Sequence, residues 1–311
     1  MTLTEIELFI VDLVHKFDQL FSSSSINGST ILAWFWWIIS HVGTVSVAIM
    51  AIYYWCINKE KGEKISFAII TSLFANSLLK SLFNRPRPFQ NKGFEHVQKM
   101  PAINNPDGSS FPSGHSQNAA TVFSSVALHE RTLFTLILAI VVITLIPVSR
   151  VYLGVHFPSD TIVGVLLGLG VSYICYLIMT YCYSHKFIFY IGALILMFPF
   201  LLINPNSETT HSVFTSFGLL AGFTLGIFIE NKFINFSCDV STKTKIIRIL
   251  IAAGILGCAY GLYSLGKKLI PDIIDSNRCG FIAIITHSPF IFDNDYIERA
   301  IDLKQYISSI K

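Results

Sequence analysis

The chain has 311 residues, of which 52% are hydrophobic and 13% are charged, and its net charge is +3. A typical soluble domain carries about 25% charged residues, so this composition excludes an ordinary water-soluble protein and predicts an integral membrane protein. The small net charge, together with the lack of a long basic run, also argues against a nucleic-acid partner.

Residues 1–21 form the first predicted element. They carry four acidic residues among the apolar positions and lack the basic start of a signal peptide. The apolar residues recur with helical spacing. We therefore expect an amphipathic helix that lies in the membrane interface, followed by a break at residues 22–30 (SSSSINGST).

Apolar stretches of about twenty residues, the length that crosses a bilayer, recur through the rest of the chain. Eight spans are expected, near residues 31–57, 65–83, 113–129, 132–150, 158–183, 187–204, 211–229 and 245–265. A ninth stretch at 280–292 is short and could span, dip or lie flat, and an amphipathic tail helix follows it. The predicted fold class is all-α, a polytopic membrane helix bundle. It consists of an N-terminal segment (1–30), a six-span core (31–204) and additional C-terminal helices (205–311).

Ionisable residues interrupt this pattern at the ends of successive spans. They are Lys80, Arg85, Arg87, His115, Arg150, His156 and Asp160. Because the chain changes side at each span, all of them are expected on one membrane face. An isolated lysine near a helix end commonly snorkels to the interface, but that does not explain the gathering. Several cations at one point repel each other unless an anion lies between them, and phosphate fits that role.

The third span begins with Pro112-Ser113-Gly114-His115. Proline suits the first turn of a helix, and the next three residues would present free N–H groups at the positive end of the helix dipole. Gly114 would let oxygen atoms approach the backbone closely. The sequence therefore predicts an anion-binding site at this helix N-terminus.

A second helix N-terminus follows at residues 156–160 (HFPSD). Asp160 stands four residues after His156 and can reach back to one nitrogen of its ring. That contact would fix the tautomer and leave the lone pair of the other nitrogen free to attack phosphorus. We therefore expect His156 to be a nucleophile and His115 to protonate the leaving oxygen.

The combined pattern resembles the three-part signature of the type 2 phosphatidic acid phosphatase superfamily. It reads Lys80-x6-Arg87-Pro88, then Pro112-Ser113-Gly114-His115, then Ser149-Arg150-x5-His156-x3-Asp160, and no signature position departs from the family pattern. The resemblance covers about residues 31–200. It implies a membrane phosphatase, a phosphoric monoester hydrolase or diphosphatase, which acts on a lipid phosphate through a phosphohistidine intermediate without a metal or other cofactor.

The resemblance also implies roles for individual residues. His156 would be the nucleophile, Asp160 its orienting partner and His115 the general acid. The residues that would hold the phosphoryl oxygens are Lys80, Arg87, Ser113, Gly114 and Arg150. Vanadium haloperoxidases share such a site but are soluble, so the hydrophobicity of this chain argues against that branch.

Several alternatives remain open on the residues. A lipid phosphotransferase would use the same site, because only the acceptor differs. A transporter would place charges near mid-span and show internal symmetry, and a non-catalytic scaffold would lack a catalytic residue; the sequence shows none of these features. Undecaprenyl diphosphate, phosphatidylglycerol phosphate, phosphatidate, lipid A phosphates and sphingoid phosphates all fit as substrates.

The loops that lie away from the expected site are consistently basic. Their basic residues are Lys59, Lys61, Lys64, Arg131, Lys186, Lys232, Lys243 and Lys245. By the positive-inside rule, these loops are cytoplasmic and the site faces the extracytoplasmic side of the cell membrane.

Polar residues outside the signature carry weaker expectations. Asn76, one turn before Lys80, could bond to that lysine or to a neighbouring helix. Lys92, His96 and Lys99 in the 84–111 loop could contact a lipid head group, but they are expected to be solvated. The GFTLG run at 222–226 is expected to be a close helix-packing face. The last spans could support a homodimer, shape a lipid entrance or brace the core.

Overall fold

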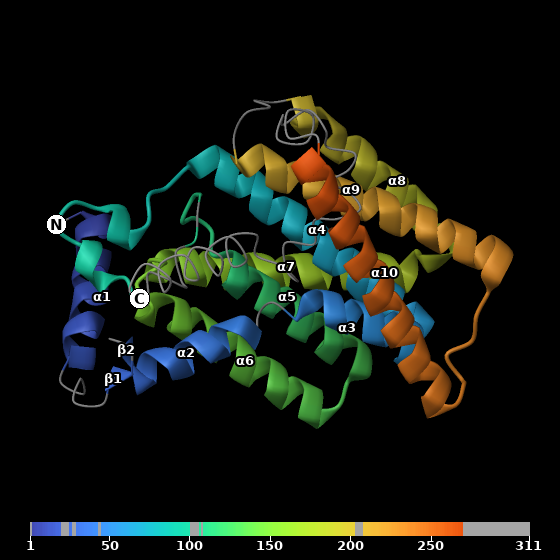
Figure 1. The fold of residues 1–311 in the computed structure, drawn as a ribbon, viewed down its shortest axis with the longest axis horizontal. Coiled ribbons are helices and arrows are strands. Elements are labelled where there is room, and N and C mark those ends of the chain that lie inside the picture. The colour runs from blue at the N-terminus through green and yellow to red at the C-terminus, as the bar shows by residue number, and fades with distance from the viewer. Residues whose placement is uncertain are drawn as a thin grey trace.

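The computed structural model describes residues 2–19, 25–26, 29–42, 45–99, 106, 108–202 and 208–269. The helices and strands, in chain order, are α1 (Leu3–Gln19), β1 (Ser25–Ile26), β2 (Ser29–Thr30), α2 (Ile31–Val42), α3 (Ser46–Ile52), α4 (Lys59–Phe83), α5 (Gly114–Glu130), α6 (Leu133–Tyr152), α7 (Pro158–Tyr181), α8 (Lys186–Met197), α9 (Glu208–Ile229) and α10 (Thr242–Leu269) (Figure 1). Short 3₁₀ turns lie at Pro88–Gln90, Glu95–Val97, Tyr183–His185 and Phe198–Leu202, and π-helical turns at Tyr53–Ile57 and Glu230–Ile234.

The helical bundle confirms the predicted fold class. The described residues also include an antiparallel pair of two-residue strands, β1 and β2, in a segment that was expected only to break the chain. The expectations for residues 280–292 and for the tail helix lie outside the described residues.

Within the described residues, five helices are long and apolar enough to cross a membrane, or six if the bent pair α2 and α3 counts as one span. The five are Lys59–Gln90, Leu133–Tyr152, Pro158–Tyr181, Tyr183–Leu201 and Ser212–Ile234; the bent pair is Ile31–Val42 with Ser46–Ile57, at an angle of 42°. Helix α5 corresponds to the expected third span and has 17 residues, at the lower limit for a spanning helix. Helix α10 corresponds to the expected eighth.

Helix α4 begins six residues before its expected start at residue 65 because Asn58 caps it. The Asn58 side chain accepts a hydrogen bond from the Lys61 backbone N–H at 2.9 Å, a standard N-cap contact. The helix ends at Asn84, whose φ of 38° stops the helical repeat.

Helix α5 lies against α4, α6 and α7. It approaches α7 so closely that a Cβ on Gly168 would lie 2.4 Å from the carbonyl oxygen of Gln117. The expected packing face on α9 is instead open, since a Cβ on Gly222 or Gly226 would meet no described atom within 4 Å. Of these glycines, the one on α7 is therefore the one that a described helix backbone approaches closely.

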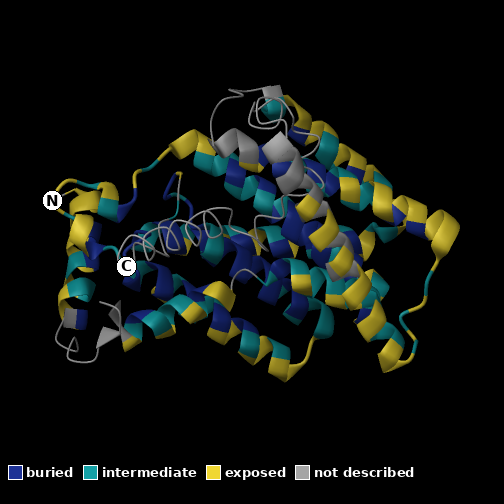
Figure 2. Cartoon of the chain, in the orientation of Figure 1, coloured by how far each residue is buried: buried dark blue, intermediate teal, exposed yellow. Residues whose placement is uncertain are grey.

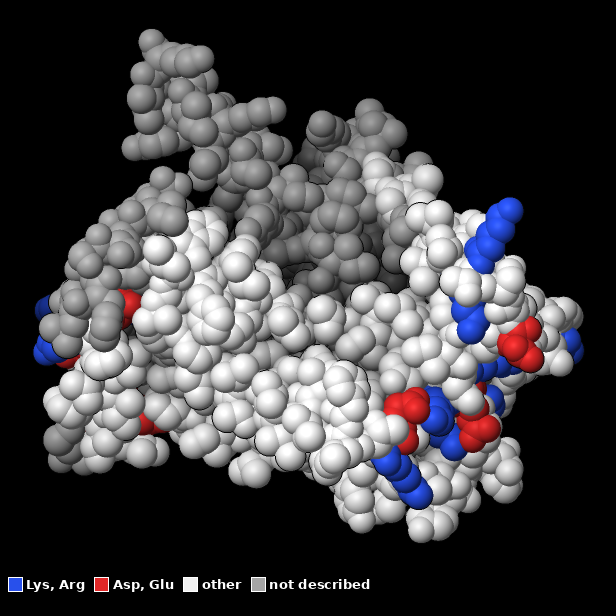
Figure 3. Space-filling view, turned by 90° about the horizontal axis from the view of Figure 1, so that it is seen from below, with Lys and Arg blue, Asp and Glu red and all other residues white. Residues whose placement is uncertain are grey.

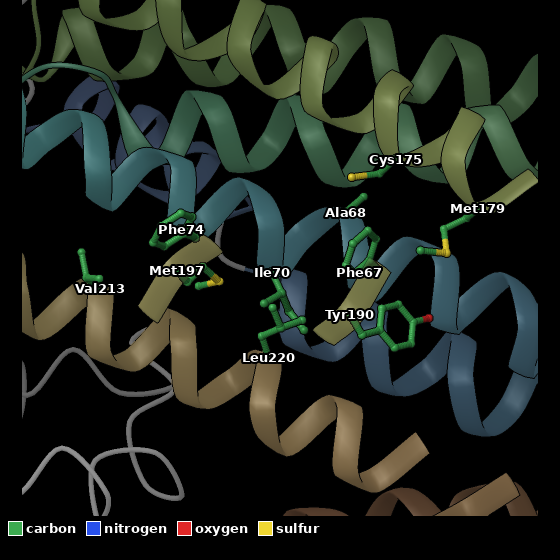
Figure 4. Packing of buried hydrophobic residues seen from close by; sticks show 10 residues of the cluster. All are labelled: Phe67, Ala68, Ile70, Phe74, Cys175, Met179, Tyr190, Met197, Val213 and Leu220. Carbon is green, nitrogen blue, oxygen red and sulfur yellow. The ribbon is translucent and has the colours of Figure 1, made fainter. Parts of the chain in front are cut away.

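Three apolar clusters pack the described part of the bundle, and two of them share α4. One joins α4, α7, α8 and α9 and includes Phe67, Met179, Tyr190 and Leu220 (Figure 4). The other packs α4, α5 and α6 and includes Ile69, Val122, Val142 and Ile146. Both clusters involve α4, so this helix anchors the two halves of the bundle.

The surface is apolar across the middle of the molecule. Large hydrophobic side chains are exposed on α6, α7 and α8, including Ile140, Leu166 and Ile195 (Figure 2). Figure 3 shows a broad face without Lys, Arg, Asp or Glu, and the charged side chains lie toward its two ends. Soluble monomers rarely expose so continuous an apolar surface, so this face fits the acyl chains of a membrane.

Helix α1 stands at the left end of the bundle in Figure 1 and is amphipathic, as predicted. Phe9, Leu13 and Phe17 are exposed, whereas Glu7 and Asp18 are buried against the rest of the protein. The acidic face of α1 is thus turned toward the rest of the protein, where Glu7 meets the start of α7.

Candidate active site

The ends of α4 and α6 meet the starts of α5 and α7 in one place. The charges of Lys80, Arg87 and Arg150 lie close enough to interact with each other, and Lys80 also interacts with Asp160. His115 interacts in the same way with His156. The expected convergence of helix ends is therefore present in the structure.

His156 lies in the short loop between α6 and α7. Its side chain is buried, and its Nε2 atom lies 3.2 Å from Nη1 of Arg87. A guanidinium has only donors, so Nε2 must be the accepting nitrogen and Nδ1 must carry the ring proton. Burial, and then the charges of Arg87, Arg150 and Lys80, lower the pKa of His156 well below its usual 6.5. The ring is thus neutral, with a lone pair on Nε2.

Asp160 faces the protonated side of the same ring. Its Oδ2 lies 3.6 Å from Nδ1 of His156, within ion-pair range but longer than a hydrogen bond. Oδ2 instead accepts from Ser110 Oγ at 2.5 Å and from the Phe157 backbone N–H at 2.9 Å. Ser110 Oγ is also 3.4 Å from Nδ1 of His156. Sequence reasoning missed Ser110, because no spacing pattern links it to residues 46 and 50 positions later.

Arg87 is held rigidly beside His156. Its side chain is buried; Nε donates to the carbonyl of Gly108 at 3.2 Å and Nη1 to that of Val155 at 3.1 Å. Its backbone N–H donates to the Gln90 side chain at 2.8 Å. These contacts fix the guanidinium next to the lone pair of the proposed nucleophile.

The other two cations have unused donors. Arg150 is buried and donates from Nη1 to Ser40 Oγ on α2 at 2.6 Å, but its Nε has no hydrogen-bond partner within the described part of the chain. No hydrogen bond joins Lys80 Nζ to any described residue. Buried donors are almost always satisfied, so both are available to the oxygen atoms of an anion.

The N-terminus of α5 differs from its expected form. The helix begins at Gly114 and Ser113 is its cap, with Oγ accepting from Ser116, so Pro112 precedes the helix instead of forming its first turn. The Ser113 N–H is not free either, because it donates to the carbonyl of Asp160 at 3.0 Å. That bond ties the start of α5 to the start of α7.

Asn76 bonds to the neighbouring helix and not to Lys80. Its amide donates to Gln117 Oε1 at 2.8 Å and to the carbonyl of Pro112 at 3.4 Å. A Cβ on Gly114 would lie 3.3 Å from Asn76 Oδ1. This contact positions the start of α5 against α4.

The expectation that the basic loop residues are solvated is wrong for Lys99. It is buried and donates to Asp18 on α1 at 2.7 Å, and burial lowers the pKa of Lys99 while Asp18 opposes that shift. His96 contacts Asp12 on the same helix at 3.0 Å. The loop therefore docks α1.

Arg85 and Glu7 also belong to the site. Arg85 was expected on this membrane face, but no sequence pattern pairs it with Asp160 or with Glu7. Arg85 Nη1 donates to Asp160 Oδ1 at 2.6 Å, and its Nη2 donates to Glu7 Oε2 at 2.6 Å. Glu7 is 78 positions away from Arg85 in the chain, so only the fold brings the two together.

Among the described residues, no group of three or more His, Cys, Asp or Glu is placed to hold a metal ion. The independence from metals stays a prediction, which chelation can test.

Comparison with known proteins gives a consistent result for the central part of the chain. Residues 63–184 match the family model of the PAP2 superfamily, where PAP2 denotes type 2 phosphatidic acid phosphatase. This segment contains every residue of the predicted site. Phosphatidylglycerophosphatase B of Bacillus subtilis is 36% identical over 108 residues, which cover 32% of this chain and 48% of that protein. The putative undecaprenyl-diphosphatase YbjG of Escherichia coli is 36% identical over 107 residues, 34% of this chain and 50% of that protein.

A decaprenylphosphoryl-5-phosphoribose phosphatase of Mycobacterium tuberculosis is 37% identical over 95 residues, 30% of this chain and 48% of that protein. The chain thus spans about half the length of the curated relatives it matches. The crystal structure of Aquifex aeolicus LpxE is similar with 26% identity and a TM-score of 0.43, covering 54% of this chain and 93% of that one. A transmembrane PAP2-type phosphatidylglycerolphosphate phosphatase from Bacillus subtilis gives 25% identity and a TM-score of 0.43, covering 55% of this chain and 83% of that one.

Proposed function

We propose that this protein is an integral-membrane lipid phosphate phosphatase, because residues 63–184 match the PAP2 superfamily model and lie within a bundle of membrane-length helices. It hydrolyses a phosphomonoester or diphosphate lipid without a metal ion. One observation carries the proposal: the lone pair on His156 Nε2 faces Arg87 inside a cluster of three buried or partly buried cations. This arrangement pairs a neutral nucleophile with a binding site for an anion.

In the first step, the cations Lys80, Arg87 and Arg150 hold the phosphoryl oxygens and offset their charge. Nε2 of His156 attacks phosphorus, a P–N bond forms, and the P–O bond to the lipid breaks. His115 gives its proton to the departing oxygen. The result is a phosphohistidine and a free lipid alcohol, or a lipid monophosphate when the substrate is a diphosphate.

In the second step, water attacks the phosphohistidine and the P–N bond breaks. His115, now deprotonated, accepts the proton from the attacking water, and inorganic phosphate leaves. Asp160 and Ser110 stand beside Nδ1 of His156 at 3.6 Å and 3.4 Å. They stabilise the positive charge that develops on the ring and keep the proton on Nδ1.

The substrate class follows from the relatives. They are named for phosphatidylglycerol phosphate, undecaprenyl diphosphate and decaprenylphosphoryl-5-phosphoribose, and each name describes a phosphate carried by a lipid. For this chain we expect the same class, with undecaprenyl diphosphate, phosphatidylglycerol phosphate and phosphatidate as the substrates to assay first.

The protein is proposed to lie in the cell membrane with its site on the extracytoplasmic face. Lys61 and Lys186 lie in the first turns of α4 and α8, and Arg131 caps the end of α5, so Lys61 and Arg131 stand at the ends of α4 and α5 that are opposite Lys80 and His115. Figure 3 shows charged side chains gathered toward the ends of the molecule. Positive loops remain in the cytoplasm, which supports this orientation. The homodimer and the role of the helices after residue 204 stay predictions.

The test follows labelled phosphate. Purified protein is mixed with lipids that carry ³²P in the terminal phosphate, quenched rapidly, and examined for phosphate release and for acid-labile, base-stable labelling of the protein. His156→Ala should abolish the label, because it removes the attacking nitrogen. His115→Ala should still be labelled by nitrophenyl phosphate, whose leaving group needs no proton, whereas its turnover of lipid phosphates should fall about 10²–10⁴-fold.

Normal labelling of His156→Ala would refute the assignment of the nucleophile. Labelling without phosphate release, relieved only when a second lipid is added as acceptor, would show that the protein is a phosphotransferase.

A further inference from the structure

Asp160 is the last member of a network of alternating charges that begins on α1 with Glu7. Glu7 Oε2 accepts from Arg85 Nη2 at 2.6 Å, and Arg85 Nη1 donates to Asp160 Oδ1 at 2.6 Å. The side chains of Glu7 and Asp160 are 5% and 0% exposed, and that of Arg85 is 20% exposed. Alternating charges at this burial are strongly coupled, because little water screens them.

Glu7 and Arg85 are each held in this network by further contacts. Glu7 Oε1 accepts from the Ser159 backbone N–H at 2.8 Å, at the N-terminus of α7, where a negative charge is stabilised by the helix dipole. The Arg85 guanidinium lies over the Phe157 ring at 4.0 Å and also donates to Ser159 Oγ at 2.7 Å. Glu7 therefore meets α7 one residue before Asp160.

The backbone of Arg85 joins the same network. Its N–H donates to Ser109 Oγ at 3.0 Å, and its carbonyl accepts from the Ser110 N–H at 2.8 Å. Ser110 in turn contacts both Asp160 and His156 through its hydroxyl. The two oxygen atoms of the Asp160 carboxylate therefore have different partners. Arg85 binds Oδ1, and Ser110 binds Oδ2, which stays turned toward His156.

We propose that Arg85 and Glu7 are positioning residues for Asp160, through which α1 sets the orientation and the basicity of His156. The inference rests on the proposed function, since it takes Asp160 as the orienting partner of the nucleophile. Arg85 prevents the carboxylate from rotating away from the ring. Glu7 offsets the charge of Arg85, so that Asp160 keeps enough negative charge to support the proton on Nδ1 of His156.

A purely structural role makes a different prediction. Helix α1 is also held by Asp18, which accepts from Lys99 at 2.7 Å and from the hydroxyl of Tyr152. Neither contact involves Arg85. If Glu7 only docks α1, then Asp18→Asn should have the same consequences as Glu7→Gln, which makes Asp18→Asn the matched control.

The experiment measures kcat and KM against pH for the wild type and for the variants Glu7→Gln, Asp18→Asn and Arg85→Lys, with a thermal melt of each. In Glu7→Gln, Arg85 loses the negative charge that offsets its own. Its positive charge then acts more strongly on Asp160 and His156, so the pKa of His156 falls. We expect kcat to fall about tenfold, the effect of one charge-assisted hydrogen bond, with little change in KM. The acid limb of kcat/KM should move to lower pH. The other groups around the ring, Lys80, Arg87 and Arg150, are unchanged.

A double substitution tests whether Glu7 acts through Arg85 or independently of it. In the Arg85→Ala background, Glu7→Gln should change kcat by less than about twofold, because the residue through which Glu7 acts is gone. Arg85→Lys should restore part of the rate lost in Arg85→Ala, and it also serves if the alanine variant fails to fold. Asp18→Asn should leave the acid limb where the wild type has it.

The pKa of His156 is also read directly by NMR titration of ring-labelled histidine, with the signal assigned by its loss in His156→Ala. This reading does not need turnover. A wild-type protein that releases no phosphate would refute the proposed function, whereas an unchanged His156 titration in Glu7→Gln would refute the present inference. Equal effects of Glu7→Gln and Asp18→Asn on kcat and on the pH profile would also overturn it, as would full additivity of Glu7→Gln and Arg85→Ala.

Discussion

The contact between α5 and α7 fixes the distance between the two helix N-termini of the site, and Gly164→Ala tests it. A Cβ on Gly164 would lie 2.7 Å from the carbonyl oxygen of Ser113 and 3.3 Å from the backbone nitrogen of Gln117. Both atoms belong to the backbone and cannot rotate aside. Ser113 is also the residue whose N–H donates to the Asp160 carbonyl at 3.0 Å, so the methyl group would push directly on the site.

The size of the effect follows from these distances. Ordinary van der Waals contact would require the two helices to separate by about half an ångström or more. Overpacking of this kind costs about 1–3 kcal/mol of stability. A misplacement of about 1 Å in a catalytic site costs about 10²-fold in rate, so the smaller displacement should lower kcat on the order of tenfold.

The assay compares Gly164→Ala with Gly222→Ala on α9, where an added Cβ meets no described atom within 4 Å. Phosphate release from the preferred lipid gives kcat and KM, and a thermal melt in detergent gives the stability. Gly222→Ala should match the wild type in both measurements, because alanine is at least as good a helix former as glycine. The reasoning is refuted if Gly164→Ala retains the wild-type kcat and melts at the same temperature as Gly222→Ala.

Three further predictions concern the chemistry and the opposite end of the bundle. Activity should survive EDTA and be inhibited by vanadate, since Lys80, Arg87 and Arg150 supply the positive charge that a metal would provide; loss in EDTA with rescue by magnesium would contradict this. Burial and the neighbouring cations lower the pKa of His156 well below 6.5, and the nucleophile must be neutral, so the acid limb of kcat/KM should lie below pH 6.5, while deprotonation of the general acid His115 gives a separate basic limb; an acid limb at or above 6.5 would count against this. Glu63 is fully buried and accepts bonds from two tyrosines and a lysine; Glu63→Ala should destabilise the protein by about 3–5 kcal/mol without moving the pH profile, as a thermal melt and a pH series would show.

The sequence was sufficient for the fold class and for the expectation that the signature residues share one end of the bundle. Apolar stretches of bilayer length identify the helices, because lipid leaves the backbone few alternatives. Alternation of the chain across the membrane then places Lys80, His115 and His156 at the same end. Both inferences depend only on local composition and on direction, which the sequence carries.

The partners of these residues could not be predicted in the same way. Ser110, Arg85 and Glu7 contact Asp160 or its neighbours across long sequence separations, and no periodic pattern connects them. The expected direct bond between Asp160 and His156 is a 3.6 Å approach, since Ser110 and a backbone N–H already occupy the facing oxygen. Which oxygen an aspartate offers depends on packing in three dimensions.

The same limit applies to helix packing. Small residues spaced four apart occur both at Gly164 and Gly168 and at Gly222 and Gly226. Among the described residues, another helix backbone crosses the first pair and not the second, and a Cβ on Gly168 would lie 2.4 Å from that backbone. The motif permits another helix to approach closely but does not determine which helix does so. The sequence alone therefore could not show which of the two glycine pairs is packed.

The contact between Arg87 and His156 suggests how the site stays ready without substrate. Protonation of Nε2 would place a proton against a guanidinium that the carbonyls of Gly108 and Val155 hold in place. Because both groups would then be cations at 3.2 Å, the lone pair remains unprotonated until an anion arrives. Under the proposed mechanism, a bound phosphate would take hydrogen bonds from Arg87 and leave the Nε2 lone pair free to attack phosphorus. The cations proposed to bind the substrate would thus also keep the proposed nucleophile neutral, so a substitution that removes Arg87 should weaken binding and raise the pKa of His156 together.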